Sequence, residues 1–488
     1  MELTFARDAR AIASAGHVLV VAPKACFGPR ARGSTALHGL LGKAEAALAL
    51  QLGAEATPGL LGGLATSRAG KQRLTVAALA DTMSRHDSPA RAEAIRKVTA
   101  AAGLDPAGKN AVLLVLDDFA HVLPACNAVG RALPTFTQKT GAKKGGSLAI
   151  VCALQNGRVL SVDPGVQGVV HAARTAACLV DTPPTELDPA AFAAAAKKML
   201  RPLPAVQVRE IVGDALLRAR LGGIHAVGRC ARAAPRLLLA TLPGKKGAPH
   251  IALVGKGVTF DTGGLHIKAR GSMETMKSDM GGAAAMLGAF TVLARHGAAA
   301  RVSLLLCLAE NAIGPAAYKP DDILTLHSGK TVEINNTDAE GRLLLADGCS
   351  YAARELGASI VLDAATLTGA QGVATGDLHA AVISNDAAVE KALLDAGMAT
   401  GDLCWPLPFA PEFYRAEFQS PIADMRNSVK NRSNAQTSCA AEFVHWHLDG
   451  TKARWGHVDL AYPAFRSDRA TGFGVALIAD AVRRLGKG

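Results

Sequence analysis

The feature that most constrains the fold of this chain is a repeated order of short apolar, β-branched runs and alanine-rich stretches. In the first third of the sequence the apolar runs lie at residues 18–21, 74–78, 112–116 and 148–151. Strands that alternate with helical stretches are typical of a parallel sheet with helices on its faces. The first third therefore predicts a small α/β domain.

A change of pattern near residue 163 marks the end of this domain. Residues 166–180 form one long helical stretch, the breaker Asp-Thr-Pro-Pro follows at 181–184, and a second helix is predicted over 189–200. A chain of 488 residues also exceeds the size at which one hydrophobic core usually keeps growing. We therefore predict two domains, at residues 1–163 and 164–488.

The second part of the chain has apolar strands of its own, at residues 237–242, 251–254, 302–306, 360–362 and 457–460. Helical stretches separate most of them, and polar residues gather at the strand ends, where open α/β sheets bind ligands. The expected fold class is α/β with two domains. The C-terminal domain should be the larger one, with a mixed, mainly parallel sheet.

The charge of the chain favours an ordinary basic surface over a nucleic acid site. The net charge is +12, but basic residues occur as pairs, such as Lys143 with Lys144, and there is no long basic run. Aromatic residues make up only 4% of the chain, which is too few to predict platforms for base stacking. Nucleic acid binding stays open as a side activity and is not favoured.

Cysteine usage and the N-terminal sequence indicate a cytoplasmic protein. The nine cysteines are an odd number, widely spaced and without a Cys-x-x-Cys pair, which is typical of reduced thiols. The first eight residues mix acids and bases where a signal peptide needs an apolar stretch, and no later stretch approaches the length of a membrane span. We expect no membrane partner.

Two glycine-rich segments carry charged residues at the ends of apolar strands. In the first, at residues 254–282, Lys256 and Asp261 interrupt an apolar run, and Asp279 follows further along. A charge at such a place is costly unless it is paired or bound to a metal ion. The glycines beside these residues let the backbone approach a ligand closely.

The second segment, at residues 331–342, begins with strand alternation and then loses it. In an extended chain, residues two apart face the same way, so we predict that Asp338 and Glu340 present both carboxylates to one point. Arg342 then opens a helix that is predicted over 343–356. A guanidinium beside a helix N-terminus makes an anion site.

The four acids of these segments, if they meet, require cations. Asp261, Asp279, Asp338 and Glu340 would place four like charges at one site, which two divalent ions can balance. Carboxylate oxygens with at most one nitrogen ligand suit Zn, Mn, Mg or Co. Each residue alone has a structural alternative, because the last two acids can cap a helix and Lys256 can reach the surface. The combination favours a two-metal site.

These two segments resemble the signature motifs of the leucyl aminopeptidase family, the cytosolic M17 metallopeptidases. The octapeptide Asn-Thr-Asp-Ala-Glu-Gly-Arg-Leu at residues 336–343 is that family's signature. The resemblance runs from about residue 174 to the C-terminus and is densest over 307–370, whereas the N-terminal third resembles the family only in its α/β rhythm. Residues 328–336 and 470–477 are most similar to the family's branch of probable aminopeptidase-like 1.

The resemblance implies a metal-dependent aminopeptidase, in which a metal-bound hydroxide hydrolyses the N-terminal peptide bond. Carried over residue by residue, it implies that one ion is bound by Lys256, Asp261, Asp279 and Glu340. The other ion would be bound by Asp261, Asp338 and Glu340. A lysine can bind a metal ion only as the neutral amine, so Lys256 would need its pKa lowered by the adjacent ions.

The same resemblance implies the other site residues. Lys268 and Arg342 become the catalytic pair, with Lys268 polarising the scissile carbonyl and Arg342 holding a bicarbonate that transfers the proton. The pocket for the first side chain of the substrate would be formed by Met276, Thr366 and Ala370, and the backbone at Leu367 and Gly369 would contact the substrate. Met276 can equally be a core residue.

The segment at residues 427–439 departs from the more glycine-rich segment that the family has there. We therefore expect peptide substrates with apolar N-terminal residues, without a stated preference for leucine. The resemblance also implies a homohexamer. The alternative from another class is a DNA-binding or scaffolding protein that keeps the peptidase fold. A scaffold would be free to lose Lys268 or Arg342, and this chain has both.

Glu442, His445 and His447 lie at helical spacing and are a further candidate group of metal ligands. The zinc-protease order His-Glu-x-x-His is absent, however. We therefore interpret these residues as structural.

Overall fold

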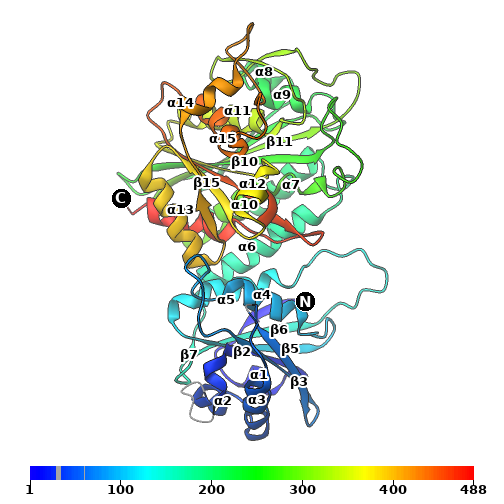
Figure 1. The fold of residues 1–488 in the computed structure, drawn as a ribbon, viewed down its shortest axis with the longest axis vertical. Helices are drawn as coiled ribbons and strands as arrows, with labels where there is room; N and C mark the ends of the chain where they lie inside the picture. The colour runs from blue at the N-terminus through cyan, green and yellow to red at the C-terminus, as the bar shows by residue number, and fades with distance from the viewer. Residues whose placement is uncertain (29–33, 60, 488) are drawn as a thin grey trace. The chain divides into compact units, whose positions relative to one another are not determined.

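The computed structural model describes residues 1–28, 34–59 and 61–487. It divides into two compact units, which comprise Met1–Arg174 with Gly397–Gly401, and Thr175–Ala396 with Asp402–Gly488. Helix α6 (Pro164–Asp181) crosses this division, and the domain junction near residue 163 stays a prediction. Each unit is built on a mainly parallel sheet, as the sequence predicts (Figure 1).

The sheet of the first unit has the spatial order β1-β6-β5-β2-β4-β3, with β7 beside β6. Its strands are β1 (Glu2–Phe5), β2 (His17–Pro23), β3 (Gly63–Ala69), β4 (Gln72–Leu79), β5 (Lys109–Leu116), β6 (Ser147–Leu154) and β7 (Val159–Leu160). Only β3 with β4 and β7 with β6 pair antiparallel. The four predicted strands, β2, β4, β5 and β6, are confirmed and lie side by side.

Helices cover both faces of this sheet, because its central strands are apolar on both sides. All residues of β2 are buried, and so are all but the first of β5. Helices α4 and α5 pack on one face, and α1, α2 and α3 pack on the other. The helices are α1 (Arg10–Ala13), α2 (Ser34–Leu40), α3 (Lys43–Glu55), α4 (Ala92–Ala101) and α5 (Val122–Arg131), with the 3-10 helices η1 (Lys24–Phe27) and η2 (Phe119–His121).

The second unit has the larger sheet, as predicted, with the order β16-β15-β18-β14-β10-β11-β9-β8. Its strands are β8 (Gln207–Val212), β9 (Arg236–Leu242), β10 (His250–Asp261), β11 (Arg301–Asn311), β14 (Ile360–Ala365), β15 (Ala380–Ser384), β16 (Cys404–Pro406) and β18 (Arg454–Asp459). The neighbours β18, β14, β10 and β11 are all parallel, whereas β9 pairs antiparallel with β11 and with β8, and β15 pairs antiparallel with β18. The five strands predicted in this part are confirmed.

Helices also cover both faces of this sheet. Figure 1 shows α11 and α15 on one side of β10 and β11, and α10 on the other. The helices are α7 (Pro189–Leu200), α8 (Ala215–Arg218), α9 (Gly222–Gly228), α10 (Gly281–His296), α11 (Gly341–Arg354), α12 (Ala370–Thr375), α13 (Ala387–Thr400), α14 (Pro411–Tyr414), α15 (Gln436–Trp446), α16 (Ala461–Ala464) and α17 (Val475–Leu485). Shorter elements are η3 (Met276–Ser278), η4 (Arg415–Phe418), β12 (Ile323–Thr325), β13 (Thr331–Glu333), β17 (Met425–Arg426), β19 (Phe465–Arg466) and β20 (Arg469–Ala470).

The parallel strands place their carboxyl ends at one edge of the sheet. Strand β10 ends there at Asp261, β11 at Asn311 and β18 at Asp459. The loop that follows β14 begins at the same edge, with Thr366. Polar residues that follow these four strands are thereby gathered, although they lie up to about 200 positions apart in the sequence.

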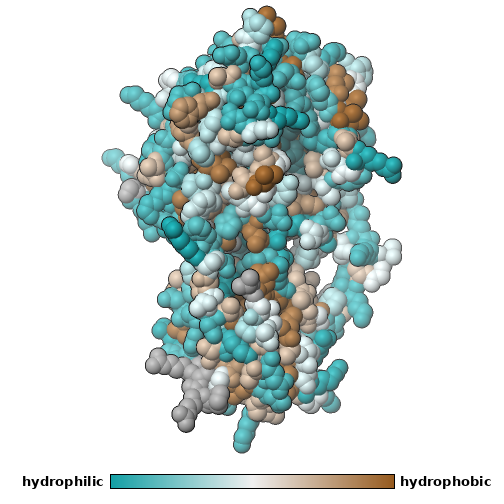
Figure 2. All heavy atoms as spheres, viewed as in Figure 1, coloured by the Kyte–Doolittle hydropathy of each residue, from teal (hydrophilic) through white to brown (hydrophobic). Residues whose placement is uncertain are grey.

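On the face of the second unit that Figure 2 shows, most residues are hydrophilic. Exposed apolar side chains include Val373, Phe413 and Ile422. Single exposed residues of this kind are normal and need no functional explanation. Among the residues that the structure describes, no helix is both long and apolar enough to span a membrane.

Glycines let α10 approach the sheet with its backbone. A Cβ atom at Gly282 would lie 2.0 Å from the carbonyl oxygen of Ala364 in β14, and one at Gly255 in β10 would lie 2.5 Å from Cα of Ala283. These neighbours are backbone atoms, which cannot rotate away. Close packing here fixes the start of α10, and with it the residues that precede the helix.

We predict that Gly282→Ala lowers the free energy of unfolding of the second unit by about 1–3 kcal/mol or more, because the added methyl overpacks the contact. Helix propensity alone would favour alanine. The control is Gly369→Ala, where a Cβ has no neighbour within 4 Å and φ is −64°, so the change should stay within about 0.5 kcal/mol. Tryptophan fluorescence in urea measures both variants, since Trp405, Trp446 and Trp455 all lie in this unit. Equal stability of the two variants would contradict the prediction.

Candidate active site

A cavity of about 750 Å³ lies in the second unit, at the carboxyl edge of the parallel strands. Eleven of the twelve predicted site residues line it, namely Lys256, Asp261, Lys268, Met276, Asp279, Asp338, Glu340, Arg342, Thr366, Leu367 and Gly369. Ala370 begins α12 and is not among the lining residues. We refer to Asp261, Asp279, Asp338 and Glu340 as the acidic cluster.

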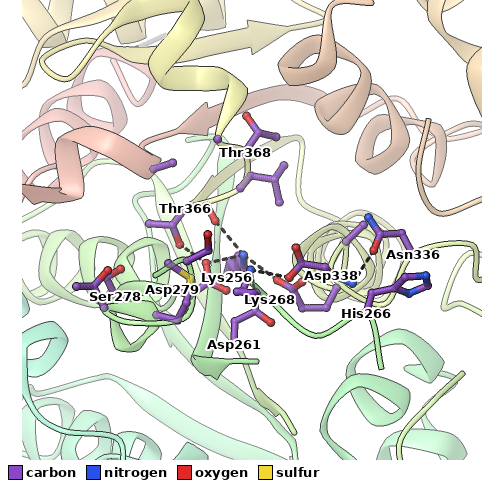
Figure 3. Close-up of a pocket in the computed structure, with 18 of the residues that line it drawn as sticks. Lys256, Asp261, His266, Lys268, Ser278, Asp279, Asn336, Asp338, Thr366 and Thr368 are labelled. Atoms are coloured by element: carbon purple, nitrogen blue, oxygen red, sulfur yellow. Dashed lines mark hydrogen bonds and ion pairs between the residues drawn. The ribbon is translucent and has the colours of Figure 1, made fainter. Parts of the chain in front are cut away.

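Lys256 lies at the centre of the site, on the buried strand β10, and only 2% of its surface is exposed. Its Nζ is 2.6 Å from Asp279 Oδ1 and 3.0 Å from Glu340 Oε1, and it donates to the carbonyl of Thr366 at 2.9 Å. Figure 3 shows Asp279 and Thr366 on one side of Lys256, and Asp338 on the other. A buried ammonium is thus held by partners from three segments of the chain.

Asp261 and Lys268 are brought together by a turn after β10. Gly263 and Gly264 have φ of +84° and +66°, and a Cβ at Gly263 would lie 2.4 Å from the carbonyl oxygen of His266, so this turn requires glycine. Nζ of Lys268 lies 2.7 Å from Asp261 Oδ2 and 2.5 Å from Asp338 Oδ1. Lys268 therefore bridges two members of the acidic cluster.

Asp338 and Glu340 meet Asp261, but not for the reason that we predicted. The chain is not extended here, because β13 ends at Glu333 and a turn through Asp338 leads to Glu340, the residue before the first turn of α11. Oxygen atoms of Asp261, Asp338 and Glu340 nevertheless lie within 4.8 Å of one another. The convergence comes from the turn and the helix start, not from strand geometry.

The acidic cluster carries more negative charge than its lysines balance. Burial raises the pKa of Asp279 well above its usual value, and the charges of Glu340 and Asp261 raise it further. Burial alone would lower the pKa of Lys256, but the neighbouring carboxylates raise it. Asp279 Oδ2 and Glu340 Oε2 are buried and have no hydrogen-bond partner among the described residues. Buried carboxylate oxygens of this kind fit divalent cations.

Arg342 lies in the first turn of α11 and is buried beside the acidic cluster. Its Nη1 donates to the carbonyl of Asn427 at 3.0 Å, and its Nε has no hydrogen-bond partner in the described part of the chain. Burial lowers the pKa of Arg342 to about 10, and the positive charge of Arg432 acts in the same direction. A buried guanidinium with a free donor can hold a small anion.

Asn427 is a residue that our sequence reasoning missed. It is fully buried and its Oδ1 accepts the backbone N–H groups of Asn335 and Asn336, at 3.0 and 3.2 Å. Its Nδ2 donates to the carbonyls of Asn336 and Ala339, at 2.6 and 3.3 Å. Asn427 therefore fixes the turn that carries Asp338. A single asparagine in a loop without periodicity gives no signal from which this role follows.

Asp459 is a second residue that we missed. It ends β18, and its carboxylate accepts the N–H of Leu367 at 3.1 Å and the hydroxyl of Thr368 at 2.7 Å. The loop after β14, where we predicted substrate contacts, is thus held by the neighbouring strand. Its position at a predicted strand end was the only available signal.

The group at the C-terminal end of α15 makes contacts outside the cavity, and its structural role stays a prediction. Glu442 pairs with Arg415 at 2.8 Å, and Nδ1 of His447 lies 2.7 Å from the hydroxyl of Ser328. His445 packs against the ring of Trp455. None of the three lines the cavity, and burial lowers the pKa of His447 to about 3.

Comparison with known proteins decides the family. The family model described as cytosol aminopeptidase family, catalytic domain, matches residues 174–479. The chain belongs to this family. It is therefore an M17 metallo-aminopeptidase, a hydrolase, as the sequence motifs indicate.

Relatives of this M17 enzyme cover most of its length. It is 44% identical to human "Probable aminopeptidase NPEPL1" over 413 residues, which are 83% of this chain and 78% of the relative. It is 39% identical to "Leucine aminopeptidase 1" of Caenorhabditis elegans over 404 residues, or 82% and 81% of the two chains. The similarity to NPEPL1 confirms the predicted branch.

Solved structures agree with this assignment. The leucyl aminopeptidase of Trypanosoma brucei in complex with bestatin has a TM-score of 0.90 and 35% identity, over 99% of this chain and 95% of that chain. The bottromycin maturation enzyme BotP in complex with Mn has a TM-score of 0.78 and 26% identity, over 97% and 100%.

One expectation about the N-terminal third was too narrow. The family model described as M17 aminopeptidase N-terminal domain 2 matches residues 44–142, so the resemblance is not limited to an α/β rhythm there. This region carries no charged glycine-rich motif, and for that reason we did not recognise it from the sequence.

We predict that Asn427→Ala lowers the free energy of unfolding by about 1–3 kcal/mol, because buried backbone groups lose their partners. Peptidase activity should fall as well, since the turn carrying Asp338 loses its support. The control is Asn385→Ala, which removes hydrogen bonds to Ala453 and Trp455 away from the cavity. Urea unfolding and peptidase assays measure both effects. Unchanged activity in Asn427→Ala would show that the turn does not need this side chain.

His447 predicts a dependence of stability on pH. Its pKa is lower in the folded state, about 3, than the ordinary value of 6.5, so it stabilises the fold above pH 6.5 and this contribution is lost as the pH falls. Between pH 7.5 and 5.5 the loss is about 1.4 kcal/mol. We expect the fall in unfolding free energy between pH 7.5 and 5.5 to be about 1.4 kcal/mol smaller in His447→Gln than in the wild type. Tryptophan fluorescence in urea measures this difference. The same pH dependence in both proteins would disprove the assignment.

Proposed function

We propose that this aminopeptidase releases apolar N-terminal residues from peptides with two divalent metal ions bound by Lys256 and the acidic cluster. The observation that carries the proposal is the set of buried carboxylates, in which Asp279 Oδ2 and Glu340 Oε2 have no partner among the described residues. Desolvated carboxylate oxygens are costly unless a cation binds them.

The residues divide between two ions as the family resemblance implies. Lys256, Asp261, Asp279 and Glu340 would hold one ion, and Asp261, Asp338 and Glu340 the other. The grouping of the last three within 4.8 Å supports this division, because shared carboxylates keep two ions close. Hard oxygen donors suit Zn or Mn, with Mg or Co as alternatives. That BotP is in complex with Mn supports manganese.

Bound metal ions supply Lewis-acid polarisation of the scissile carbonyl and a nucleophile derived from water at neutral pH. Lys268 would donate a hydrogen bond to the carbonyl oxygen as negative charge develops on it. The position of its Nζ beside Asp261 and Asp338, in the acidic cluster, supports this role. Arg342 would hold a bicarbonate through its free Nε and move the proton by way of that anion.

Substrate recognition would use the loop after β14. Thr366, Leu367 and Gly369 line the cavity together with Met276, and Asp459 holds the loop in place. We propose that Met276 and Thr366 contact the first side chain and that the backbone at Leu367 and Gly369 contacts the peptide. For Ala370, which does not line the cavity, the role rests on the resemblance alone.

Our proposals for the assembly and the compartment rest on the family resemblance. We propose a homohexamer that acts on peptides in the cytoplasm, in keeping with the description of the family as cytosol aminopeptidases. The alternative of a DNA-binding or scaffolding protein is less well supported, because Lys268 and Arg342 are both retained and both line the cavity.

The test is hydrolysis of a panel of aminoacyl amides by the protein supplied with Mn²⁺ or Zn²⁺. We expect turnover of amides with apolar residues, and a fall of about 10²–10³-fold in kcat for Lys268→Met, the range for loss of an oxyanion donor. The double variant Asp338→Ala, Glu340→Ala should be inactive. Lys319→Met, an exposed lysine outside the cavity, is the control and should keep full activity.

Two results would refute the proposal. One is absence of turnover by the wild type across the whole panel with every metal. The other is equal turnover by the wild type and the double variant, because the acidic cluster would then have no part in the reaction.

A further inference from the structure

The loop of residues 427–435, which connects β17 to α15, carries a cation that the mechanism does not use. Ser428 and Arg432 of this loop line the active-site cavity, and so does Gln436 at the start of α15. Arg432 is exposed, and it has no hydrogen bond or ion pair with any residue that the structure describes. It belongs to the segment of residues 427–439, where we expected a departure from the family's pattern.

The backbone of this loop is fixed on both sides of Arg432. Glu417 of η4 accepts the N–H of Asn431 at 3.0 Å and the side-chain amide of Asn434 at 2.9 Å through its carboxylate. The carbonyl of Glu417 also accepts the N–H of Lys430 at 3.0 Å. The backbone at Arg432 is therefore ordered before a ligand binds, which lowers the entropic cost of binding through its side chain.

The loop begins on one definite side of the cavity. Ser428 exchanges hydrogen bonds with Asn335, at 2.9 and 3.1 Å, next to Asn336. Figure 3 shows Asn336 on the opposite side of Lys256 from Ser278 and Asp279. The pocket proposed for the first side chain, with Met276 and Thr366, lies on the Asp279 side, since Thr366 donates to Asp279 at 2.8 Å. The loop thus starts where the residue after the scissile bond would lie.

The charges on this side of the cavity suit an anion. Arg342 and Arg432 both line the cavity, so two guanidinium groups border this region. An anionic group between them would relieve their repulsion, and a carboxylate matches the forked donors of a guanidinium.

We propose that Arg432 binds a carboxylate on the residue that follows the scissile bond, so that the enzyme prefers dipeptides with a free C-terminus. This inference rests on the proposed aminopeptidase function. The carboxylate can be the C-terminus of a dipeptide or the side chain of an acidic second residue. Peptides that are longer, and have a neutral second residue, present neither group at this position.

The experiment compares kcat/KM for Leu-Gly, Leu-Gly amide, Leu-Asp amide, Leu-Asn amide and Leu-Lys amide in the wild type, Arg432→Gln and Arg432→Glu. A charge-assisted hydrogen bond predicts that the wild type prefers Leu-Gly to its amide by about ten- to hundredfold, mostly through KM, and that Arg432→Gln loses this preference. A higher kcat/KM for Leu-Asp amide than for Leu-Asn amide would show that the carboxylate of an acidic side chain is bound as well as a terminal carboxylate. Arg432→Glu should instead favour Leu-Lys amide.

The control is Arg301→Gln, which removes the same charge at the amino end of β11, away from the cavity. Tryptophan fluorescence checks that each variant is folded. The inference would be overturned if the ratio of kcat/KM for Leu-Gly to that for Leu-Gly amide were the same in the wild type and Arg432→Gln. It would also be overturned if Arg432→Gln lowered kcat/KM equally for all substrates, because Arg432 would then serve only the anion at Arg342. If the wild type hydrolysed none of the peptides, the proposed function itself would fail.

Discussion

Mutual repulsion among four buried carboxylates is the constraint on which the active site depends. The acidic cluster contributes four negative charges, and its ion pairs with Lys256 and Lys268 supply only two positive charges. Burial removes the water that would otherwise screen this excess, which is why the pKa values of Asp279 and Glu340 are raised. Among the described residues, Asp279 Oδ2 and Glu340 Oε2 remain without hydrogen-bond partners, and divalent cations would supply the missing counter-charge. The proposed reaction, with metal ions and Lys268, depends on this one arrangement.

The fold produces the arrangement by ending parallel strands at one edge. Strand β10 carries Lys256 inside the sheet and Asp261 at its end, and the close approach of α10 through Gly282 places Asp279 beside them. The start of α11 adds Glu340. Strand β10, the starts of α10 and α11, and the turns at Gly263 and Asp338 thus hold the charged groups. Asn427 and Asp459 fix two loops of the site from outside the motifs.

Much of this could be predicted from the sequence, for reasons that are specific to each feature. Buried parallel strands have apolar sequences, so β2, β5, β10 and β11 could be predicted. Lys256 and Asp261 could be predicted as site residues because their charges interrupt such a run. The conformation around Asp338 was predicted wrongly, because strand alternation does not show where a turn begins. Asn427 was missed since its role depends on backbone groups some 90 positions away. The N-terminal region was recognised only as α/β, because its sequence has no charged glycine-rich motif.

The central claim is that the acidic cluster binds two metal ions, and the most direct test is the stoichiometry of binding. Protein freed of metal with a chelator would be titrated with Mn²⁺ in a calorimeter, beside the variant Asp338→Ala, Glu340→Ala. The account predicts two ions per chain in the wild type and at most one, held weakly by Lys256, Asp261 and Asp279, in the variant. No binding by the wild type, or the same stoichiometry and affinity in both proteins, would contradict it.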